Sequence, residues 1–321
     1  METVSVVIPL FNKAQYIQRA VASALVQTYE RWALLVIDDG STDGSAQVVT
    51  GFSDSRIRLI QQANAGVSAA RNLGVRAAQT ALVAFLDADD AWAPTFLETV
   101  LRLYTQYPHA GMYATACEWR EPQRVFVPPI SHIPAAPWEG LMPSYFKSAA
   151  TGYLPITASS VMVPQAVFEQ IGYFPVGIRH GEDHDMWARI ALRYPVAFSW
   201  VVGAVYFRDT QGRACETAPA EKEPPFIAFA EGLIKEGAIQ ADIVQDLKEY
   251  IVGVRLYLAQ ECVFRINRPH LPRQYLKHSS HTVLFRKKWY WLRLFLFFPY
   301  PLRISFRKMK RWLFPAQSLL G

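Results

Sequence analysis

Three carboxylates stand within four residues at the end of the apolar run Leu82–Leu86. Asp87 and Asp89 are two residues apart, so in an extended chain both side chains point to the same side. That arrangement suits a hard divalent cation such as Mg²⁺ or Mn²⁺, which prefers oxygen ligands and shares them with a substrate diphosphate. The alternative is a turn with a helix cap, a role that Asp90 alone could fill. We predict a metal site at Asp87 and Asp89.

A second pair of carboxylates ends the apolar run Ala33–Ile37. A carboxylate at the end of a strand can accept a hydrogen bond from an N–H group of a nucleobase. Asp, Ser and Thr also favour helix N-caps, and Asp43 or Thr42 would supply that cap. Asp38 and Asp39 then need another reason, because two adjacent carboxylates are unfavourable without a partner. We therefore expect a nucleobase contact here.

The chain turns from the run Val4–Leu10 into an aromatic residue and an amide. Pro9 near the end of that run indicates the rim of a sheet, since proline cannot donate to a central ladder. Phe11 could stack on a base and Asn12 could bond to it. Ordinary turn chemistry is the alternative.

Small residues surround a possible helix start at residues 64–72. Asn64 and Gly66 would let the helix begin close to a ligand. Arg71, one turn into the helix, could reach a base carbonyl or a phosphate. The alternative is a surface arginine on an alanine-rich helix.

A third acidic cluster precedes the helical pattern of residues 184–194. Glu182 or Asp183 could take the proton of a hydroxyl group as that group attacks. Both could instead be acids that the dipole of the helix favours at its N-terminus. His180 and His184 flank the acids and could touch an acceptor or a phosphate, or be ordinary surface groups.

Short apolar runs alternate with amphipathic stretches, which is typical of an α/β fold with a doubly wound sheet. Such a sheet binds its ligand at the switch-point loops. Residues 121–157 are rich in proline and are predicted to be irregular. The expected strands are Val4–Leu10, Ala33–Ile37, Ile57–Gln61, Leu82–Leu86, Ala158–Val163 and Val196–Phe207. The expected helices are 13–27, 44–51, 67–79, 94–107, 164–171 and 184–194, with two more within 224–265.

Five motifs, in chain order, resemble those of the family 2 glycosyltransferases with a GT-A fold. They are Val-Val-Ile-Pro-Leu-Phe-Asn, Val-Ile-Asp-Asp-Gly-Ser-Thr-Asp, Asn-Ala-Gly-Val-Ser-Ala-Ala-Arg-Asn, Phe-Leu-Asp-Ala-Asp-Asp and Gly-Glu-Asp-His-Asp-Met-Trp-Ala-Arg. The resemblance covers roughly residues 3–210. It implies a mixed sheet with helices on both faces. It also implies sugar transfer from a nucleotide-sugar to a hydroxyl group, with metal assistance and inversion.

The resemblance also implies roles for single residues. Nucleotide contacts are assigned to Pro9, Phe11, Asn12, Asp39, Asn64, Gly66, Arg71, Asp87 and Ala88, with Asp39 bonding the base. Asp87 and Asp89 match the metal-binding DxD motif, with Asp89 the direct ligand and Asp87 nearer the ribose. Asp183 matches the general base, and an exchange of roles with Glu182 stays open.

The donor is expected to be a UDP-sugar, although a carboxylate at Asp39 would accept from guanine N1–H as well as from uracil N3–H. One rival is a nucleotidyltransferase, which usually has a Gly-rich loop after its first strand, where this chain has Phe11-Asn12-Lys13. The other is a non-catalytic, membrane-docked protein that binds nucleotide-sugar or scaffolds a glycan pathway.

Charge is distributed unevenly along the chain. Residues 1–261 carry 20 basic and 27 acidic residues, whereas residues 262–321 carry 13 basic residues and no acid. Within residues 285–314, cations flank a core of aromatic and aliphatic residues that is too short to span a bilayer. Proline at positions 299 and 301 should break the helix there. We expect this segment to lie on an anionic membrane surface, rather than to bind nucleic acid or a partner protein.

The expected domains are 1–220, with a nucleotide-sugar half (1–110) and an acceptor half (111–220), then a helical extension (221–265) and a basic aromatic tail (266–321). Three distant cysteines do not fit a disulfide framework or a thiolate metal site, and they favour a reducing compartment. The N-terminal residues are expected to form a strand, not a secretory signal. These features predict a cytoplasmic protein on the inner face of the cell membrane, acting on a glycan or a lipid-linked acceptor.

Overall fold

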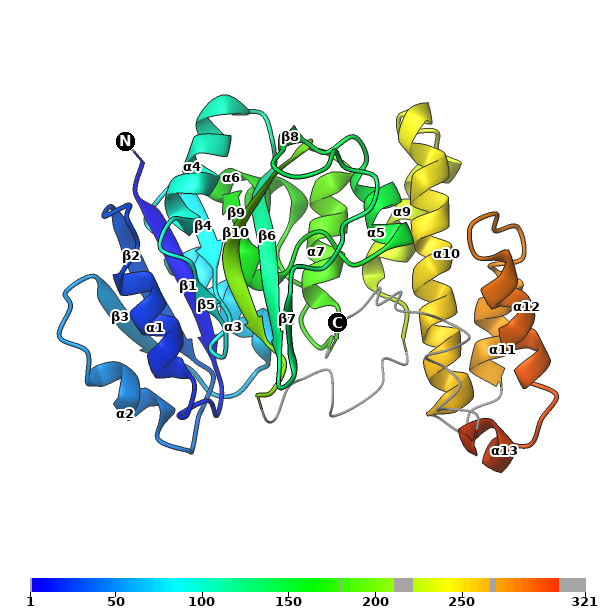
Figure 1. Cartoon of the computed structure of the whole chain (residues 1–321), viewed down its shortest axis with the longest axis horizontal. Coiled ribbons are helices and arrows are strands. Elements are labelled where there is room, and N and C mark those ends of the chain that lie inside the picture. The colour runs from blue at the N-terminus through cyan, green and yellow to red at the C-terminus, as the bar shows by residue number, and fades with distance from the viewer. Residues whose placement is uncertain (1, 179, 211–221, 266–269, 306–321) are drawn as a thin grey trace.

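The computed structural model describes residues 2–178, 180–210, 222–265 and 270–305. In this part of the chain a ten-stranded sheet has the order β3-β2-β1-β4-β9-β6-β10-β5, with β7 beside β6 and β8 beside β10 (Figure 1). Its strands are β1 (Val4–Leu10), β2 (Trp32–Asp38), β3 (Ile57–Gln61), β4 (Leu82–Phe85), β5 (Ala91–Trp92), β6 (Met112–Glu121), β7 (Arg124–Phe126), β8 (Glu139–Leu141), β9 (Val161–Pro164) and β10 (Val196–Phe207).

The helices connect these strands and continue beyond the sheet. The first group is α1 (Ile17–Leu25), α2 (Ser45–Thr50), α3 (Val67–Ala77), α4 (Phe96–Gln106), α5 (Tyr145–Thr151), the 3₁₀ helix η1 (Ala158–Ser160), α6 (Gln165–Ile171) and α7 (Glu182–Ala191). The second group is α9 (Pro225–Lys235), α10 (Ala241–Phe264), α11 (His270–Lys277), α12 (Arg286–Phe295) and α13 (Tyr300–Ser305).

The sheet is mixed, as predicted. Strands β1, β2, β3 and β4 are parallel, whereas β9 is antiparallel to both β4 and β6. The chain moves outward from β1 to β2 and β3, then returns to place β4 on the other side of β1. This reversal makes the carboxyl ends of β1 and β4 the switch point of the sheet, where α/β folds bind ligands. The ladder between β1 and β4 ends at Val7, so Pro9 does not have to donate a backbone hydrogen bond to β4.

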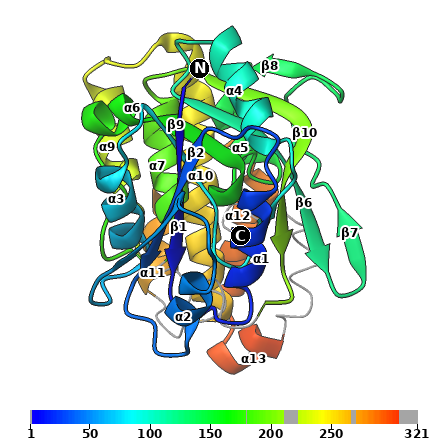
Figure 2. The same ribbon diagram turned by 90° about the vertical axis from the view of Figure 1, so that its left-hand side faces the viewer.

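Two apolar clusters cover the two faces of the sheet. Val4, Val6 and Ile8 of β1 face a cluster with α1, α2 and α4, whereas Val7 faces a cluster with α3, α6 and α7. Seen from the β3 edge, α1 and α3 accordingly lie on opposite sides of β1 (Figure 2). Both faces are therefore buried, which explains why the strand is a continuous apolar run.

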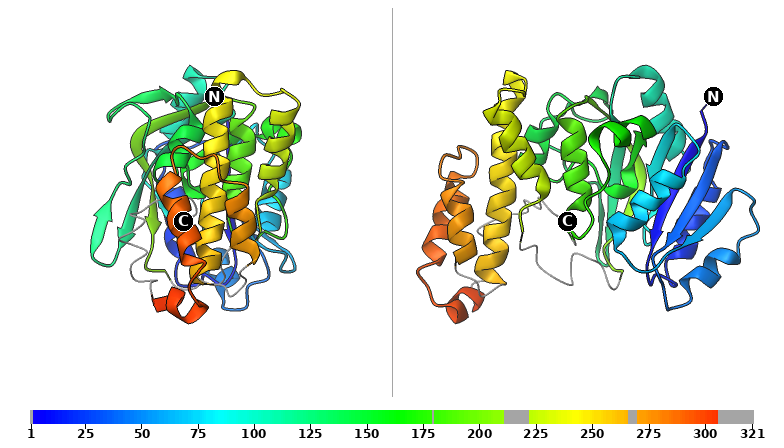
Figure 3. Two further views of the ribbon diagram at one scale, coloured as in Figure 1. Left: turned by 90° about the vertical axis from the view of Figure 1, so that its right-hand side faces the viewer. Right: turned by 180° about the vertical axis from the view of Figure 1, so that it is seen from behind.

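The second cluster extends from the sheet into the C-terminal helices. Helix α10 packs against α5, and α11 and α12 pack on α10, on the side away from the sheet (Figure 3). Leu292 and Phe295 of α12 are buried in this cluster. Helix α12 ends before the prolines, in agreement with the predicted break. About half of the apolar residues in the tail, however, pack against other helices of the protein. The predicted domain boundaries stay predictions, and residues 306–314 of the tail lie outside the described residues.

No helix in the described residues is both long enough and apolar enough to cross a membrane.

Several predicted elements differ from the structure. The predictions for Val4–Leu10, Ile57–Gln61 and Val196–Phe207 are confirmed to the residue. Strand β6 was not predicted, although Tyr113, Thr115 and Trp119 favour strands, because the alanines and charged residues between them weaken the pattern and burial in the sheet decides the conformation. The segment 121–157 contains β7, β8 and α5, so the prediction of an irregular stretch is wrong in those places.

Two predicted boundaries are also wrong. The start of the predicted strand Ala158–Val163 is the 3₁₀ helix η1, because Thr157 and Ser160 close a turn there, with the Thr157 N–H donating to Ser160 Oγ at 3.1 Å. Helix α7 begins at Glu182, so Glu182 and Asp183 lie in its first turn rather than before it.

We predict that Gly74→Ala destabilises the protein. A Cβ atom at Gly74 of α3 would lie 2.3 Å from Cγ1 of Val7, a buried residue of β1, so α3 would have to move away from the sheet. Overpacking of this kind costs roughly 1–3 kcal/mol. Urea unfolding would measure the loss.

Gly232→Ala in α9 is the matched control, since a Cβ atom there meets nothing within 4 Å. It should be neutral or slightly stabilising, because alanine favours the helix. Equal effects of the two substitutions would contradict the close approach of α3 to β1.

Candidate active site

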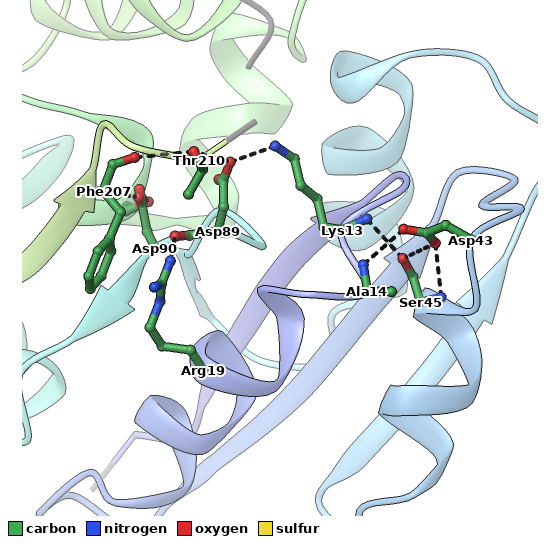
Figure 4. A network of polar contacts seen from close by, with 10 residues as sticks. Lys13, Ala14, Arg19, Asp43, Ser45, Asp89, Asp90, Phe207 and Thr210 are labelled. Carbon is green, nitrogen blue, oxygen red and sulfur yellow. Dashed lines mark hydrogen bonds and ion pairs between the residues drawn. The ribbon is translucent and has the colours of Figure 1, made fainter. Parts of the chain in front are cut away.

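The loop after β1 is fastened to the loop before α2 by backbone donors (Figure 4). Three successive N–H groups donate to side chains: Asn12 to Ser41 Oγ (3.0 Å), Lys13 to Ser45 Oγ (2.9 Å) and Ala14 to Asp43 Oδ2 (2.9 Å). Asn12 also has a positive φ of 50°, which Asn tolerates better than most residues. Its Oδ1 accepts the N–H of Thr42 at 2.8 Å, so the amide shapes the loop.

Phe11 lies beside this loop with 47% of its surface exposed, and a planar ligand could stack on it. The side chain of Ala88 is buried in the core, so any contact with a nucleotide would come from its backbone. Asn64 and Gly66 lie at the surface where α3 begins. Contacts of these residues and of Pro9 with a nucleotide stay predictions.

Asp39 fixes the start of α3. Its Oδ1 accepts from the Ala65 N–H (2.9 Å) and from Gln62 Nε2 (2.6 Å), and its Oδ2 accepts from the Gly66 N–H (2.8 Å). A carboxylate has about four acceptor directions, so Oδ2 keeps one for an imide N–H of a base. The base contact stays a prediction. The neighbouring Asp38 is buried and accepts from the Ser41 N–H and from Gln61.

Arg71 joins the two acidic clusters. Its Nη2 lies 2.8 Å from Asp87 Oδ1 at the end of β4, and its Nη1 lies 2.7 Å from Glu182 Oε1 at the start of α7. Arg71 is only 3% exposed. Burial alone would lower the pKa of Arg71, but the charges of Asp87, Glu182 and Asp183 together raise it above its usual value. Arg71 is therefore a buried cation between two acids, and its predicted contact with a base or phosphate stays a prediction.

Asp89 is held by a second cation. Lys13 Nζ lies 2.7 Å from Asp89 Oδ2, and the Thr210 hydroxyl donates to the same oxygen at 3.2 Å (Figure 4). Arg19 of α1 donates to the backbone carbonyl of Asp89 and lies 3.4 Å from the ring centroid of Phe207. The residue at the centre of the predicted metal site thus already has positive charge beside it.

Asp90 is a structural acid. It accepts from the Ser159 hydroxyl at 2.5 Å and from the Phe207 N–H at 3.3 Å. Burial, and next the charges of Asp89 and Asp87, raise its pKa well above the usual value. The next helix begins only at Phe96, so the alternative interpretation of Asp90 as a helix cap is wrong. Ser159 also accepts the Asp87 N–H at 3.1 Å, which fixes the turn that carries all three acids.

Glu182 and Asp183 differ in their surroundings. Burial, and next the charge of Asp183, raise the pKa of Glu182 to about 7, against the opposing effect of Arg71. Asp183 is not joined to Arg71; its Oδ1 accepts the His184 N–H at 2.9 Å and lies 3.6 Å from His184 Nε2. Glu182 is thus bound to Arg71, whereas Asp183 is not and is available to a ligand.

The donor set could hold a hard cation only with help from a ligand. Among the described residues no group of three or more His, Cys, Asp or Glu side chains could hold a metal ion by itself. Asp87 and Asp89 project from one turn, and Asp87 keeps 31% of its side chain exposed. Mg²⁺ and Mn²⁺ sites of nucleotide enzymes commonly use one or two carboxylates and take their other ligands from phosphates and water. The residues present fit that pattern.

Sequence reasoning missed the groups that orient these acids. Lys13 directly follows a recognised motif but gave no sign of its partner, and Thr210 and Ser159 gave none at all. Asn72 was also missed: its side chain exchanges two hydrogen bonds of 2.9 Å with the backbone of Phe174, which fastens α3 to the segment before α7.

Comparison with known proteins follows the same segments. The family model described as Glycosyl transferase family 2 matches residues 5–158. These residues contain the exits of β1, β2 and β4 and the start of α3.

Residues 5–158 therefore carry the sequence pattern of glycosyl transferase family 2.

Curated relatives of this family match parts of the chain. An "Uncharacterized glycosyltransferase" of Rickettsia felis is 31% identical over 192 residues, covering 59% of this chain and 30% of that protein. The Escherichia coli protein named UDP-Glc:alpha-D-GlcNAc-diphosphoundecaprenol beta-1,3-glucosyltransferase WfgD is 39% identical over 111 residues, covering 34% of this chain and 44% of that protein. The chain therefore spans less than half the length of these relatives.

Solved structures of similar fold extend beyond the family 2 segment. S. aureus TarS 1-349 in complex with UDP-GlcNAc aligns with a TM-score of 0.70 and 16% identity, covering 96% of this chain and 92% of that chain. The mannosyltransferase PcManGT from Pyrobaculum calidifontis, in complex with GDP-Man and Mn²⁺, aligns with a TM-score of 0.56 and 17% identity, covering 97% and 85%. The predicted GT-A-type fold is confirmed.

We predict that Arg71→Met destabilises the protein more at pH 8 than at pH 5. Removing one member of a buried ion pair costs about 3–5 kcal/mol, because the remaining charge loses its partner. The pKa of Glu182, about 7 in the folded protein, lies above its usual value of 4.5, and it rises further without the arginine. The folded state then holds the proton more firmly than the unfolded chain, so stability falls as the pH rises through this range. Urea unfolding at both pH values measures the difference.

Arg56→Met is the matched control. Arg56 pairs with Asp54 at the surface, and hydrogen bonds from Arg56 lower the pKa of Asp54 to about 2. Its loss should therefore have the same effect at pH 5 and pH 8. A loss for Arg71→Met that does not change with pH would contradict the role given to Glu182.

Proposed function

We propose that the protein transfers a sugar from a UDP-sugar to a hydroxyl group of a glycan or a lipid-linked acceptor, with inversion at the anomeric carbon. The observation that carries the proposal is the Arg71 bridge, which brings Asp87 at the switch point and the acids of α7 to one place. A diphosphate-binding turn and a candidate base then face the same substrate.

The donor proposal rests on the exits of β1 and β2. Phe11 offers an exposed ring, and Asp39 keeps an acceptor for the imide N–H of uracil. The name of WfgD describes a UDP-Glc-dependent enzyme, and TarS was solved with UDP-GlcNAc, which supports a UDP-sugar. PcManGT was solved with GDP-Man, so guanine is the alternative base.

We further propose that Asp89, with Asp87, holds Mn²⁺ or Mg²⁺. Bound there, the ion would neutralise charge that develops on the departing diphosphate. Lys13 is positioned to pair with Asp89 or with a phosphate of the donor, because its ammonium group already lies at the carboxylate. Arg71 orients Asp87 and opposes the rise in the pKa of Asp87 that burial causes. The complex of PcManGT with Mn²⁺ supports this proposal.

Asp183 is the proposed general base. A sugar hydroxyl group is a weak nucleophile, and a carboxylate within hydrogen-bonding distance takes its proton as the new C–O bond forms. Glu182 is less suited to this role because Arg71 already occupies one of its oxygens. A single displacement by the activated hydroxyl group inverts the anomeric carbon.

The acceptor proposal is a sugar carried on a lipid diphosphate, met at the inner face of the cell membrane. The name of WfgD describes an acceptor of that kind. The alternative function, a non-catalytic nucleotide-sugar-binding or scaffold protein, would need neither Asp89 nor Asp183.

We predict that Asp183→Asn lowers turnover by at least about 100-fold while leaving the affinity for UDP unchanged, because an amide cannot take a proton. Turnover is measured as UDP released from UDP-sugars in the presence of a lipid-diphosphate-linked sugar.

Glu182→Gln is the matched variant and should affect stability more than turnover, since it weakens the pair with Arg71. The opposite pattern would make Glu182 the base. Wild-type protein that binds UDP without any turnover would favour the scaffold.

We predict that calorimetric titration with UDP, GDP and dTDP shows tight binding of UDP only when Mn²⁺ is present. In Asp89→Asn, UDP should bind weakly whether or not Mn²⁺ is present, because the substitution removes the carboxylate charge that attracts the ion. Tight binding of GDP instead would change the donor. Absence of binding to any nucleotide would overturn the proposed function.

A further inference from the structure

Helix α12 carries aromatic and aliphatic side chains on more than one side but is covered on one side only. Phe285, Lys288, Leu292 and Phe295 recur every three or four residues and are buried against the rest of the protein. Trp289 is partly buried beside them, whereas Tyr290, Trp291 and Leu294 are exposed. The apolar stripe of a surface helix normally faces the core, so the exposed apolar side chains need an explanation.

The exposed apolar residues of α12 and of the segments directly before and after it form a group that we call the outer face of α12. It consists of the exposed residues Val283, Leu284, Tyr290, Trp291, Leu294, Phe297 and Phe298. Phe297 is 84% exposed and Tyr290 is 61% exposed. Single exposed apolar residues are common on proteins, but a contiguous group of aromatic and aliphatic side chains marks an interaction surface.

Basic residues border this face. Arg286, Lys287 and Arg293 are exposed on α12, and Arg273 and Lys277 are exposed on α11. The sequence has no Asp or Glu after Glu261, so no acid of this segment compensates them.

We propose that the outer face of α12 docks on an anionic lipid membrane. Aromatic side chains suit the boundary between headgroups and acyl chains, and the flanking cations suit anionic headgroups. A second copy of the chain fits less well, because two such faces would bring cations together without acids to pair with them. The helix would lie in the surface plane and not cross the bilayer.

This orientation agrees with the location of the candidate site. Helix α13 lies at the end of the molecule toward which β1 runs, which is the end that carries Asp87 and Asp89 (Figure 1). Docking through α12 would place the membrane on the side of α10 away from the sheet, with α13 at the end of the molecule that carries the candidate site. The link to a lipid-linked acceptor rests on the proposed function, whereas the docking itself does not.

Co-sedimentation of the full-length chain with vesicles tests the proposal. The wild type should bind vesicles of phosphatidylglycerol and phosphatidylcholine and bind pure phosphatidylcholine much less. Trp291→Glu combined with Phe297→Glu should weaken binding at least about tenfold, because two apolar anchors are lost. Lys287→Glu should weaken binding to the anionic vesicles about fivefold or more and have little effect with phosphatidylcholine.

Val26→Glu is the matched control, since Val26 is equally exposed but lies at the end of α1. It should bind like the wild type. Circular dichroism and UDP titration show whether each variant is folded, so a failure of docking is distinguishable from a failure of donor binding.

Unchanged vesicle binding by the double variant would overturn the proposal. So would a wild type that ignores vesicles but self-associates through these residues, or one that binds RNA instead.

Discussion

The ion pairs of Arg71 are the interaction on which the candidate site depends. A guanidinium that is almost completely buried is stable only with its charge compensated, and Asp87 and Glu182 supply that compensation from β4 and α7. The same contacts set the distance between the two halves of the fold. Arg71 thus contributes both to the stability of the fold and to the geometry of the site. The turn that carries Asp87 therefore cannot shift without disturbing α7.

A second constraint is the density of negative charge at the exit of β4. Asp90 does not add to this charge at the surface, because it is buried and accepts hydrogen bonds from Ser159 and Phe207. Asp89 instead keeps a flexible cation, Lys13, beside it. An acid that is balanced by a movable ammonium group can exchange that partner for a metal ion or a phosphate. An acid that is paired with the buried Arg71 keeps one oxygen occupied, so Asp87 and Glu182 can offer a ligand only their other oxygen.

The sequence was sufficient where one physical signal dominates. Strands β1 and β10 are mainly runs of β-branched and aromatic residues, β3 has two isoleucines and a leucine among its five residues, and the bounds of all three were predicted to the residue. The acids at the exits of β2 and β4 were found because carboxylates after apolar runs are unusual. Strand β6 was missed because alanines and charged residues interrupt its strand-favouring residues, so that its conformation depends on neighbours in the sheet.

The partners of the acids were beyond reach for a different reason. Ser159, Thr210 and Lys13 contact the turn at 87–90 from 70 or more residues away, and only the strand order brings them together. The tail shows the same limit. Its aromatic and aliphatic core before Pro299 was predicted to lie on a membrane surface, yet Leu292 and Phe295 are buried against the protein, which only the packing of the helices could reveal.

The fastening of the acidic turn by later segments has a consequence for how the protein is made. During synthesis the acids of residues 87–90 leave the ribosome well before Ser159, Phe207 and Thr210. At usual elongation rates the interval is roughly ten seconds. Lys13 and Arg71 are already present to pair with Asp89 and Asp87, but Asp90 lacks the donors that fix it until Ser159 and Phe207 have been made. Competence for donor binding would then arise late and together with the acceptor half, which keeps a partly made chain from engaging nucleotide-sugar.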